Sequence, residues 1–248
     1  MITKEITSLQ HQIVKHLVLL RKERSYRKEK NRALIAGYKL ISECSSLITQ
    51  LFLEIGTPVP PSVRAPEIVY VTPEILKKIT GLENPEPVAA EISLPESGSL
   101  EGKQRILALD GISDPGNLGT LIRSALALGW QGVFITANST DPFNEKAVRA
   151  AKGASFRMPL QIGTHEELLA LIARNNMQAI VADTAGGPLS SLKVHSPLLL
   201  ILGNESHGVS QEIKDRYTAI KIPMDQMESL NVASAGAILM HALRVAAS

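Results

Sequence analysis

The chain has 248 residues, of which 44% are hydrophobic and 20% charged, and its formal net charge is +2. These values indicate a globular protein with two small domains or one large domain, and such a small net charge does not by itself indicate nucleic-acid binding. No charged leader and no apolar run approaching about 18 residues is present, so we expect neither a signal peptide nor a membrane span and place the protein in the cytoplasm. The single cysteine, Cys44, cannot form an internal disulfide and fits a reducing compartment.

Positive charge is concentrated near the amino terminus. Residues 1–32 contain nine Lys or Arg against three Glu. Apolar residues between positions 13 and 20 follow a helical spacing, and the basic segment after them surrounds Tyr26. A charge run is commonly a solvated helix end, but this density and the central aromatic favour a surface that contacts RNA phosphates. We predict RNA contacts at Arg24, Arg27, Lys28 and Arg32.

The remainder of the first hundred residues predicts a small α/β domain. Its patterns indicate two helices and four short strands, at 37–49, 73–80, 33–36, 51–55, 68–71 and 88–92. Alternation of this kind is typical of a sheet covered by helices. Pro, Gly and Ser in residues 94–104 then indicate a linker.

The second half opens with a predicted strand at 105–109 and the turn DGISDPGN. The helix that follows places its apolar residues on one side and Arg123 off that side, where a surface cation is the ordinary explanation. Later patterns predict one helix and five strands, at 164–175, 132–136, 157–161, 178–183, 198–202 and 219–222. Six strands alternating with helices imply a mainly parallel sheet.

Two turns and a small-residue helix near the carboxyl terminus form a candidate ligand site. The last two predicted strands end in the permissive turns GNE and PM, as buried parallel strands do where they deliver a ligand loop. We predict Ser229 as the N-cap of the final helix, whose first turns carry the small residues VASAGA. Close packing against another backbone would also explain these small residues.

Several common chemistries have no sequence signature here. The chain lacks the GxGxxG and Walker A phosphate loops and the GxSxG elbow of many hydrolases. Its six histidines are scattered, without paired His or Cys spacing, so no metal site is expected.

The motifs GNESHGVS, IPM and SLN, in that order, closely resemble the second and third motifs of the SpoU (TrmH) family, the RNA ribose 2'-O-methyltransferases of the SPOUT superfamily. The segment DPGNLGTLIR is similar to the family's first motif. The resemblance implies that residues 105–248 form a SPOUT methyltransferase domain of the α/β class, with a mainly parallel sheet and a deep trefoil knot. It also implies an L30e-like RNA substrate-binding domain at 1–96, a linker at 97–104, and a homodimer.

The function implied by this resemblance is S-adenosylmethionine-dependent methylation of a ribose 2'-hydroxyl in RNA, with ribosomal (23S) RNA as the expected substrate. Three alternatives stay open: a tRNA ribose methyltransferase, a base methyltransferase of the same superfamily, and a non-catalytic RNA-binding protein on this scaffold. The intact motif residues argue against the last alternative, and SLN favours ribose over base.

The resemblance also assigns roles to residues. The catalytic set is Arg123, Asn117, Glu205, Ser229 and Asn231. The cofactor-binding set is Thr184, Gly203, Asn204, Glu205, Gly208, Ile222, Met224, Leu230, Asn231 and Ala233. Lys152, in the family-like segment FNEKAVRAAKGAS, is expected to contact RNA.

The reaction requires a ribose hydroxyl in line with a sulfonium methyl group and a route for the hydroxyl proton. The resemblance implies an activating role for Arg123, but a guanidinium stays protonated in proteins. We therefore hypothesise that Arg123 binds the adjacent RNA phosphate and orients the hydroxyl, while Glu205 or water accepts the proton. We further hypothesise that Arg123 of one protomer serves the cofactor bound by the other.

Overall fold

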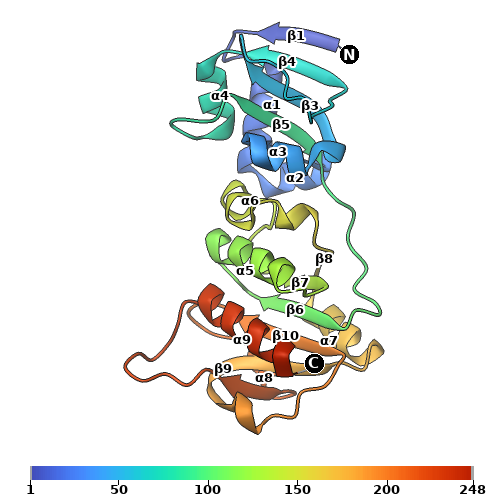
Figure 1. Cartoon of the computed structure of the whole chain (residues 1–248), viewed down its shortest axis with the longest axis vertical. Helices are drawn as coiled ribbons and strands as arrows, with labels where there is room; N and C mark the ends of the chain where they lie inside the picture. Colours follow the sequence, from blue (N-terminus) through green and yellow to red (C-terminus); the bar gives the residue numbers. More distant parts are fainter. Residues whose placement is uncertain (1, 247–248) are drawn as a thin grey trace. The chain divides into compact units, whose positions relative to one another are not determined.

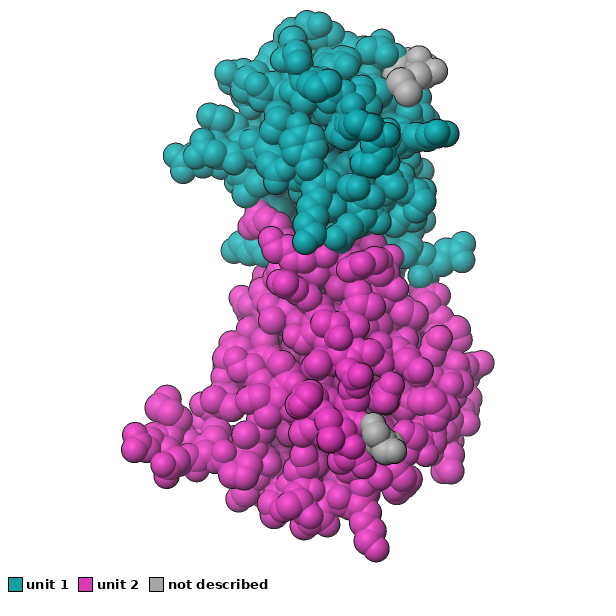
Figure 2. Space-filling model, viewed as in Figure 1, with its two compact units in different colours: residues 1–96, 143–148 teal, residues 97–142, 149–248 magenta. Residues whose placement is uncertain are grey.

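The computed structural model describes residues 2–246. The chain divides into two compact units, one made of Met1–Glu96 with Phe143–Val148 and the other of Ser97–Pro142 with Arg149–Ser248 (Figure 2). Each unit has its own sheet (Figure 1).

The first unit contains a five-stranded mixed sheet in the order β1-β4-β3-β5-β2. Strands β1, β4 and β3 are parallel, whereas β5 runs antiparallel to β3 and β2. The elements in chain order are β1 (Ile2–Ile6), α1 (Gln12–Lys22), α2 (Arg24–Lys30), β2 (Arg32–Ala36), α3 (Tyr38–Glu43), η1 (Ser45–Leu47), β3 (Ile48–Glu54), β4 (Glu67–Val71), α4 (Pro73–Thr80) and β5 (Val88–Ser93).

The four predicted strands of this unit and the helix at 73–80 are confirmed. One prediction was wrong, and one strand was missed. The helix expected at 37–49 ends at Glu43, because Ile48 and the residues after it pair with β5 instead. Strand β1 was missed, since ITKEI has a charged centre and gains its strand conformation by adding to the edge of the sheet beside β4.

The second unit contains a six-stranded sheet in the order β11-β9-β10-β6-β7-β8, and all neighbouring strands are parallel. The prediction of a mainly parallel sheet is therefore confirmed. Its elements are β6 (Arg105–Asp110), α5 (Pro115–Ala127), β7 (Gly132–Thr136), η2 (Ala154–Phe156), β8 (Leu160–Gly163), α7 (His165–Arg174), β9 (Gln178–Pro188), η3 (Leu189–Ser191), β10 (Leu198–Gly203), α8 (Gln211–Lys214), β11 (Thr218–Lys221) and α9 (Val232–Ala246); α6 (Glu145–Ala151) spans the boundary between the units.

Helices cover both faces of this sheet. On one face α5 and α9 lie side by side (Figure 1), and Gly236 of α9 leaves room for Leu121 of α5 and Leu202 of β10. On the other face Leu168 and Leu171 of α7 share a buried cluster with alternate residues of β6 and β10. Strand β10, buried along its whole length, therefore lies in the centre of the unit.

Three local expectations need correction. The strand expected at 157–161 begins at Leu160, because Ala154–Phe156 forms a 3₁₀ turn before it. The final helix begins at Val232 rather than at Ser229. The segment 97–104 contains no regular element, yet Leu100 is only 1% exposed and packs into the core of the second unit, so the segment is partly anchored.

In the part of the chain that the structure describes, no helix combines the length and apolar character needed to cross a membrane. Within residues 2–246, no cluster of three or more His, Cys, Asp or Glu residues is arranged to hold a metal ion.

Candidate active site

A cavity of about 580 Å³ lies at the carboxyl ends of β10 and β11, beside the middle of β9 and the start of α9. Every predicted cofactor residue except Ala233 lines it: Thr184, Gly203, Asn204, Glu205, Gly208, Ile222, Met224, Leu230 and Asn231. Ala233 is buried in the first turn of α9. Of the predicted catalytic residues, Ser229 also lines the cavity, whereas Asn117 and Arg123 do not.

The turn after β10 forms one wall of the cavity, and its backbone folds back very tightly. Asn204 and Gly208 exchange two backbone hydrogen bonds of 2.9 Å, and the Asn204 Oδ1 accepts the amides of Ser206 and His207. A Cβ atom on Gly203 would lie 2.1 Å from the Gly208 carbonyl carbon and the Val209 nitrogen. Glycine is therefore required at position 203, because a side chain cannot be placed against the backbone at that distance.

An ion pair that the sequence did not predict lies in the wall of the cavity. Lys214 Nζ of α8 lies 2.5 Å from Asp183 Oδ2 of β9, and both residues line the cavity. The hydrogen bond from Lys214 lowers the pKa of the Asp183 carboxyl. Sequence reasoning missed this pair because 31 positions separate two ordinary surface-type residues that only the sheet brings together.

The Glu205 carboxylate joins the second motif to the first. It accepts four hydrogen bonds, from Ser113 N (3.1 Å), Ser113 Oγ (2.8 Å), Asp114 N (3.2 Å) and Asn117 Nδ2 (3.0 Å). Asp114 caps α5 by accepting the Asn117 amide at 2.7 Å, so Asn117 lies in the first turn of that helix. A carboxylate placed at the start of α5 is also favoured by the helix dipole.

Asn231 extends the network to the third motif. Its Nδ2 donates to Asn117 Oδ1 at 3.0 Å, and its Oδ1 accepts the amides of Ala233 and Ser234. Asn231, rather than the predicted Ser229, therefore caps α9. Glu205, Asn117 and Asn231 form one continuous chain of hydrogen bonds, which we call the motif network.

These bonds set the protonation state of Glu205. Partial burial raises the pKa of its carboxyl, but the hydrogen bonds from Asn117 and Ser113 lower it more, so the pKa is about 2. A carboxylate with so low a pKa, whose oxygens already accept four donors, is a poor proton acceptor. The structure thus argues against Glu205 as the base and favours its role in orienting the first motif.

Arg123 lies on the exposed side of α5 and does not line the cavity. Among residues 2–246 its guanidinium has no hydrogen-bond or ion-pair partner. Within a single chain it is therefore not brought together with the cofactor residues.

The predicted RNA contacts have different environments. Arg24, Lys28 and Lys152 are exposed, and Arg32 Nε lies 3.6 Å from Glu91 Oε1. The RNA contact predicted at Arg27 is wrong, because Arg27 is only 3% exposed. Its Nη1 instead donates to the carbonyls of Leu20 (2.7 Å) and Arg21 (2.9 Å). It satisfies the last turn of α1 and is not available to a phosphate.

Comparison with known proteins agrees with this arrangement. Residues 104–241 match the model of the SpoU rRNA Methylase family. The 23S rRNA (guanosine(2553)-2'-O)-methyltransferase RlmP of Bacillus subtilis is 31% identical over 97% of this chain and 99% of its own length.

A 23S rRNA (adenosine(1067)-2'-O)-methyltransferase of Streptomyces laurentii is 30% identical over 55% of this chain and 52% of its own length. The crystal structure of an AdoMet-bound rRNA methyltransferase from Sinorhizobium meliloti superposes with a TM-score of 0.87 at 28% identity, covering 98% of both chains. The family-model match over more than half of the chain, together with the 31% identity to RlmP over nearly all of it, shows that the chain belongs to the SpoU rRNA methylase family.

Proposed function

We propose that the protein transfers the methyl group of S-adenosylmethionine to a ribose 2'-hydroxyl of 23S ribosomal RNA. The observation that carries this proposal is the motif network, in which Glu205, Asn117 and Asn231 connect three distant motifs beside one cavity. The similarity to relatives named as 23S rRNA 2'-O-methyltransferases supports the same reaction.

The cavity suits S-adenosylmethionine. Ile220, Ile222 and Leu239 give it an apolar wall for a flat base, while Gly203 and Gly208 leave backbone groups accessible to polar atoms. When bound, the cofactor supplies an electrophilic methyl group whose leaving group is neutral.

The chain's own residues then have to orient the RNA and exclude competing positions. The motif network fixes the starts of α5 and α9 at the cavity and holds Glu205 ionised. With Glu205 occupied, solvent water accepts the hydroxyl proton. Arg123, always protonated, binds the RNA phosphate next to the target ribose.

A homodimer completes this site. Arg123 is exposed and does not line its own cavity, and α9 exposes Ile238 (47%) and Val245 (63%). Two large apolar side chains seven residues apart on one helix face suit a self-complementary twofold interface. In such a dimer Arg123 of one protomer serves the cavity of its partner.

The remaining architectural expectations are part of the same proposal. Strand β11 is at the edge of the sheet next to β9, whereas α9 packs on β10 and α5. The chain between them must therefore cross the end of β9, which supports a carboxyl-terminal trefoil knot. The mixed sheet of the first unit, with exposed Arg24 and Lys28 on α2, supports an L30e-like RNA substrate-binding domain.

The test uses the full-length protein, cofactor labelled in its methyl group, and unmodified 23S rRNA or total tRNA. We expect label in 23S rRNA at a position whose phosphodiester resists alkali, because a methylated 2'-hydroxyl cannot attack it. Label in an alkali-sensitive position would indicate base methylation, and label in tRNA alone would change the substrate. RNA binding without any incorporation would leave only the non-catalytic alternative.

A further inference from the structure

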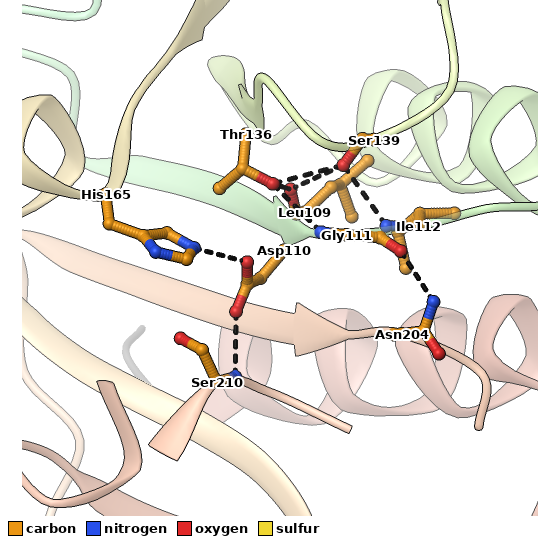
Figure 3. A network of polar contacts seen from close by, with 9 residues as sticks. All are labelled: Leu109, Asp110, Gly111, Ile112, Thr136, Ser139, His165, Asn204 and Ser210. Carbon is orange, nitrogen blue, oxygen red and sulfur yellow. Dashed lines mark hydrogen bonds and ion pairs between the residues drawn. The ribbon is translucent and has the colours of Figure 1, made fainter. Parts of the chain in front are cut away.

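A second polar cluster lies behind the turn that follows β10 and takes no part in the motif network. Asp110, at the carboxyl end of β6, is only 3% exposed. Its Oδ1 lies 2.6 Å from His165 Nε2 at the start of α7, and its Oδ2 accepts the backbone amide of Ser210 at 2.9 Å, just before α8 (Figure 3). We call Asp110, His165 and Ser210 the Asp110 clamp.

The clamp faces the α7 side of the sheet. Ile106 and Ala108, at alternate positions of β6, belong to the buried cluster under α7, so Asp110 continues the same face. The neighbouring strand places Gly203 opposite Asp110 in the register of β6 and β10. The buried carboxylate therefore lies directly beside the start of the turn that walls the cavity.

Two anchors hold that turn. At its beginning, Asn204 Nδ2 donates to the Gly111 carbonyl at 2.8 Å (Figure 3). At its end, the Ser210 amide donates to Asp110. Residues 206–208 lie between the anchors and line the cavity, so a shift at either anchor changes the cavity wall.

His165 fixes the second anchor. A carboxylate in this position only accepts hydrogen bonds, so Nε2 of His165 carries the proton that it donates. A buried carboxylate requires partners for its lone pairs, and without His165 the Asp110 side chain would turn toward solvent or another donor.

We propose that His165 and Asp110 are positioning residues for cofactor binding, which hold the cavity-lining turn 204–210 in place through the Ser210 amide. This inference rests on the proposed function, in that the cavity is taken as the cofactor site. Neither residue lines the cavity, so both act through the turn.

The experiment measures the dissociation constant of S-adenosylmethionine for the full-length protein by calorimetry, together with kcat at saturating cofactor. His165→Ala removes one partner of Asp110, and the 30% exposure of the His165 side chain favours a folded variant. Ser210→Pro removes the other donor and pushes the Asp110 carboxylate away, because a ring carbon replaces the amide hydrogen, while the φ of −57° at Ser210 already suits proline. We expect each to raise the dissociation constant about fivefold, with kcat changed less than about twofold.

Two matched controls separate positioning from general destabilisation. Thr164→Ala removes the cap of the same helix one residue earlier without touching Asp110. Ser210→Ala removes the hydroxyl, which is buried without a partner among the described residues, and keeps the amide. Both should bind the cofactor as the wild-type protein does, and His165→Gln, which keeps a donor, should recover part of the lost affinity.

If the clamp acts as one unit, the His165→Ala/Ser210→Pro double variant should lose less affinity than the two single losses combined. Unchanged binding in both single variants, or an equal loss in Thr164→Ala, would overturn the inference. Leu230→Arg tests the cavity assignment itself, since an arginine there would obstruct the cavity. If Leu230→Arg binds the cofactor with wild-type affinity, the cavity is not the cofactor site. If Leu230→Arg loses affinity while His165→Ala and Ser210→Pro keep it, only the clamp inference is refuted.

Discussion

The Glu205 carboxylate connects the second motif to the first through hydrogen bonds from Ser113 and Asn117. Four donors surround it, and its pKa is about 2 rather than the ordinary 4.5. Near neutral pH it is fully ionised, so its pH dependence should be visible in stability and not in the rate of methyl transfer.

Glu205→Gln tests this assignment, because the amide group of glutamine brings a donor toward the N–H groups of Ser113 and Asp114. A carboxyl whose folded pKa is depressed stabilises the protein above its unfolded pKa and loses that contribution as the pH falls through the folded pKa. The variant should therefore be about 1 kcal/mol less stable at pH 7, a value discounted for the exposure of Glu205. The difference should shrink between pH 4.5 and about 2.

Urea unfolding at several pH values measures this difference, and Glu228→Gln, an exposed carboxyl outside the network, is the control. The pH–rate profile of the wild-type enzyme should show no titration that disappears in Glu205→Gln. If the wild-type pH–rate profile shows a limb with the pKa of a carboxylate and Glu205→Gln lacks that limb, Glu205 is instead the proton acceptor.

Arg27 is a second residue whose role follows from burial. We expect Arg27→Ala to destabilise the first unit by about 2 kcal/mol, because two carbonyls at the end of α1 lose a charged donor. Its exposed neighbour provides the control, so Lys28→Ala should change stability by less than about 0.5 kcal/mol. Thermal unfolding followed by circular dichroism compares the two, and equal losses would contradict the capping role.

At the scale of elements, helix α2 presents Arg24 and Lys28 one turn apart on an exposed face. If both contact RNA phosphates, the Arg24→Gln/Lys28→Gln variant should lower the slope of log affinity against log salt by about 0.7 to 0.9 per lost contact. Affinity for S-adenosylmethionine should stay unchanged. An unaltered slope in a filter-binding titration would show that this helix face is simply solvated.

The turn after β10 gives a prediction about backbone approach. Gly203→Ala should abolish cofactor binding, because the added Cβ would lie 2.1 Å from backbone atoms of Gly208 and Val209 and the turn would have to open. Gly187→Ala in β9 is the matched control, since its nearest neighbour would be Ser191 Oγ at 3.8 Å. Calorimetric titration measures cofactor binding by both variants. Equal binding by Gly203→Ala and Gly187→Ala would contradict this prediction.

At the scale of the whole molecule, a shared active site predicts complementation between two inactive variants. Arg123→Ala removes the proposed phosphate contact, and Leu230→Arg obstructs the cavity. If Arg123 works in trans, a mixed dimer has one intact site, and random pairing restores about a quarter of wild-type activity after co-folding. If Arg123 works in cis, every site keeps one defect and the mixture stays inactive.

The alternation of strand and helix patterns was enough to predict a mainly parallel sheet, since burial of both faces leaves a near-continuous apolar run in a central strand such as β10. The resemblance of GNESHG, IPM and SLN to the SpoU family predicted many of the residues that line the cavity, because each of these motifs is contiguous in the chain. Short or edge elements such as β1 and the true start of α9 were not predicted, because partners elsewhere in the fold determine them.

Only the tertiary structure decided which partners the site residues have. Glu205 lies 88 residues from Asn117, and Asn231 lies 114 residues from it, so no local pattern contains their hydrogen bonds. The low pKa of Glu205 and the Asp110 clamp both arise from such distant contacts. Residue type and spacing determined which groups were available to this protein, and packing determined their partners, because desolvation and hydrogen bonding depend on neighbours in space.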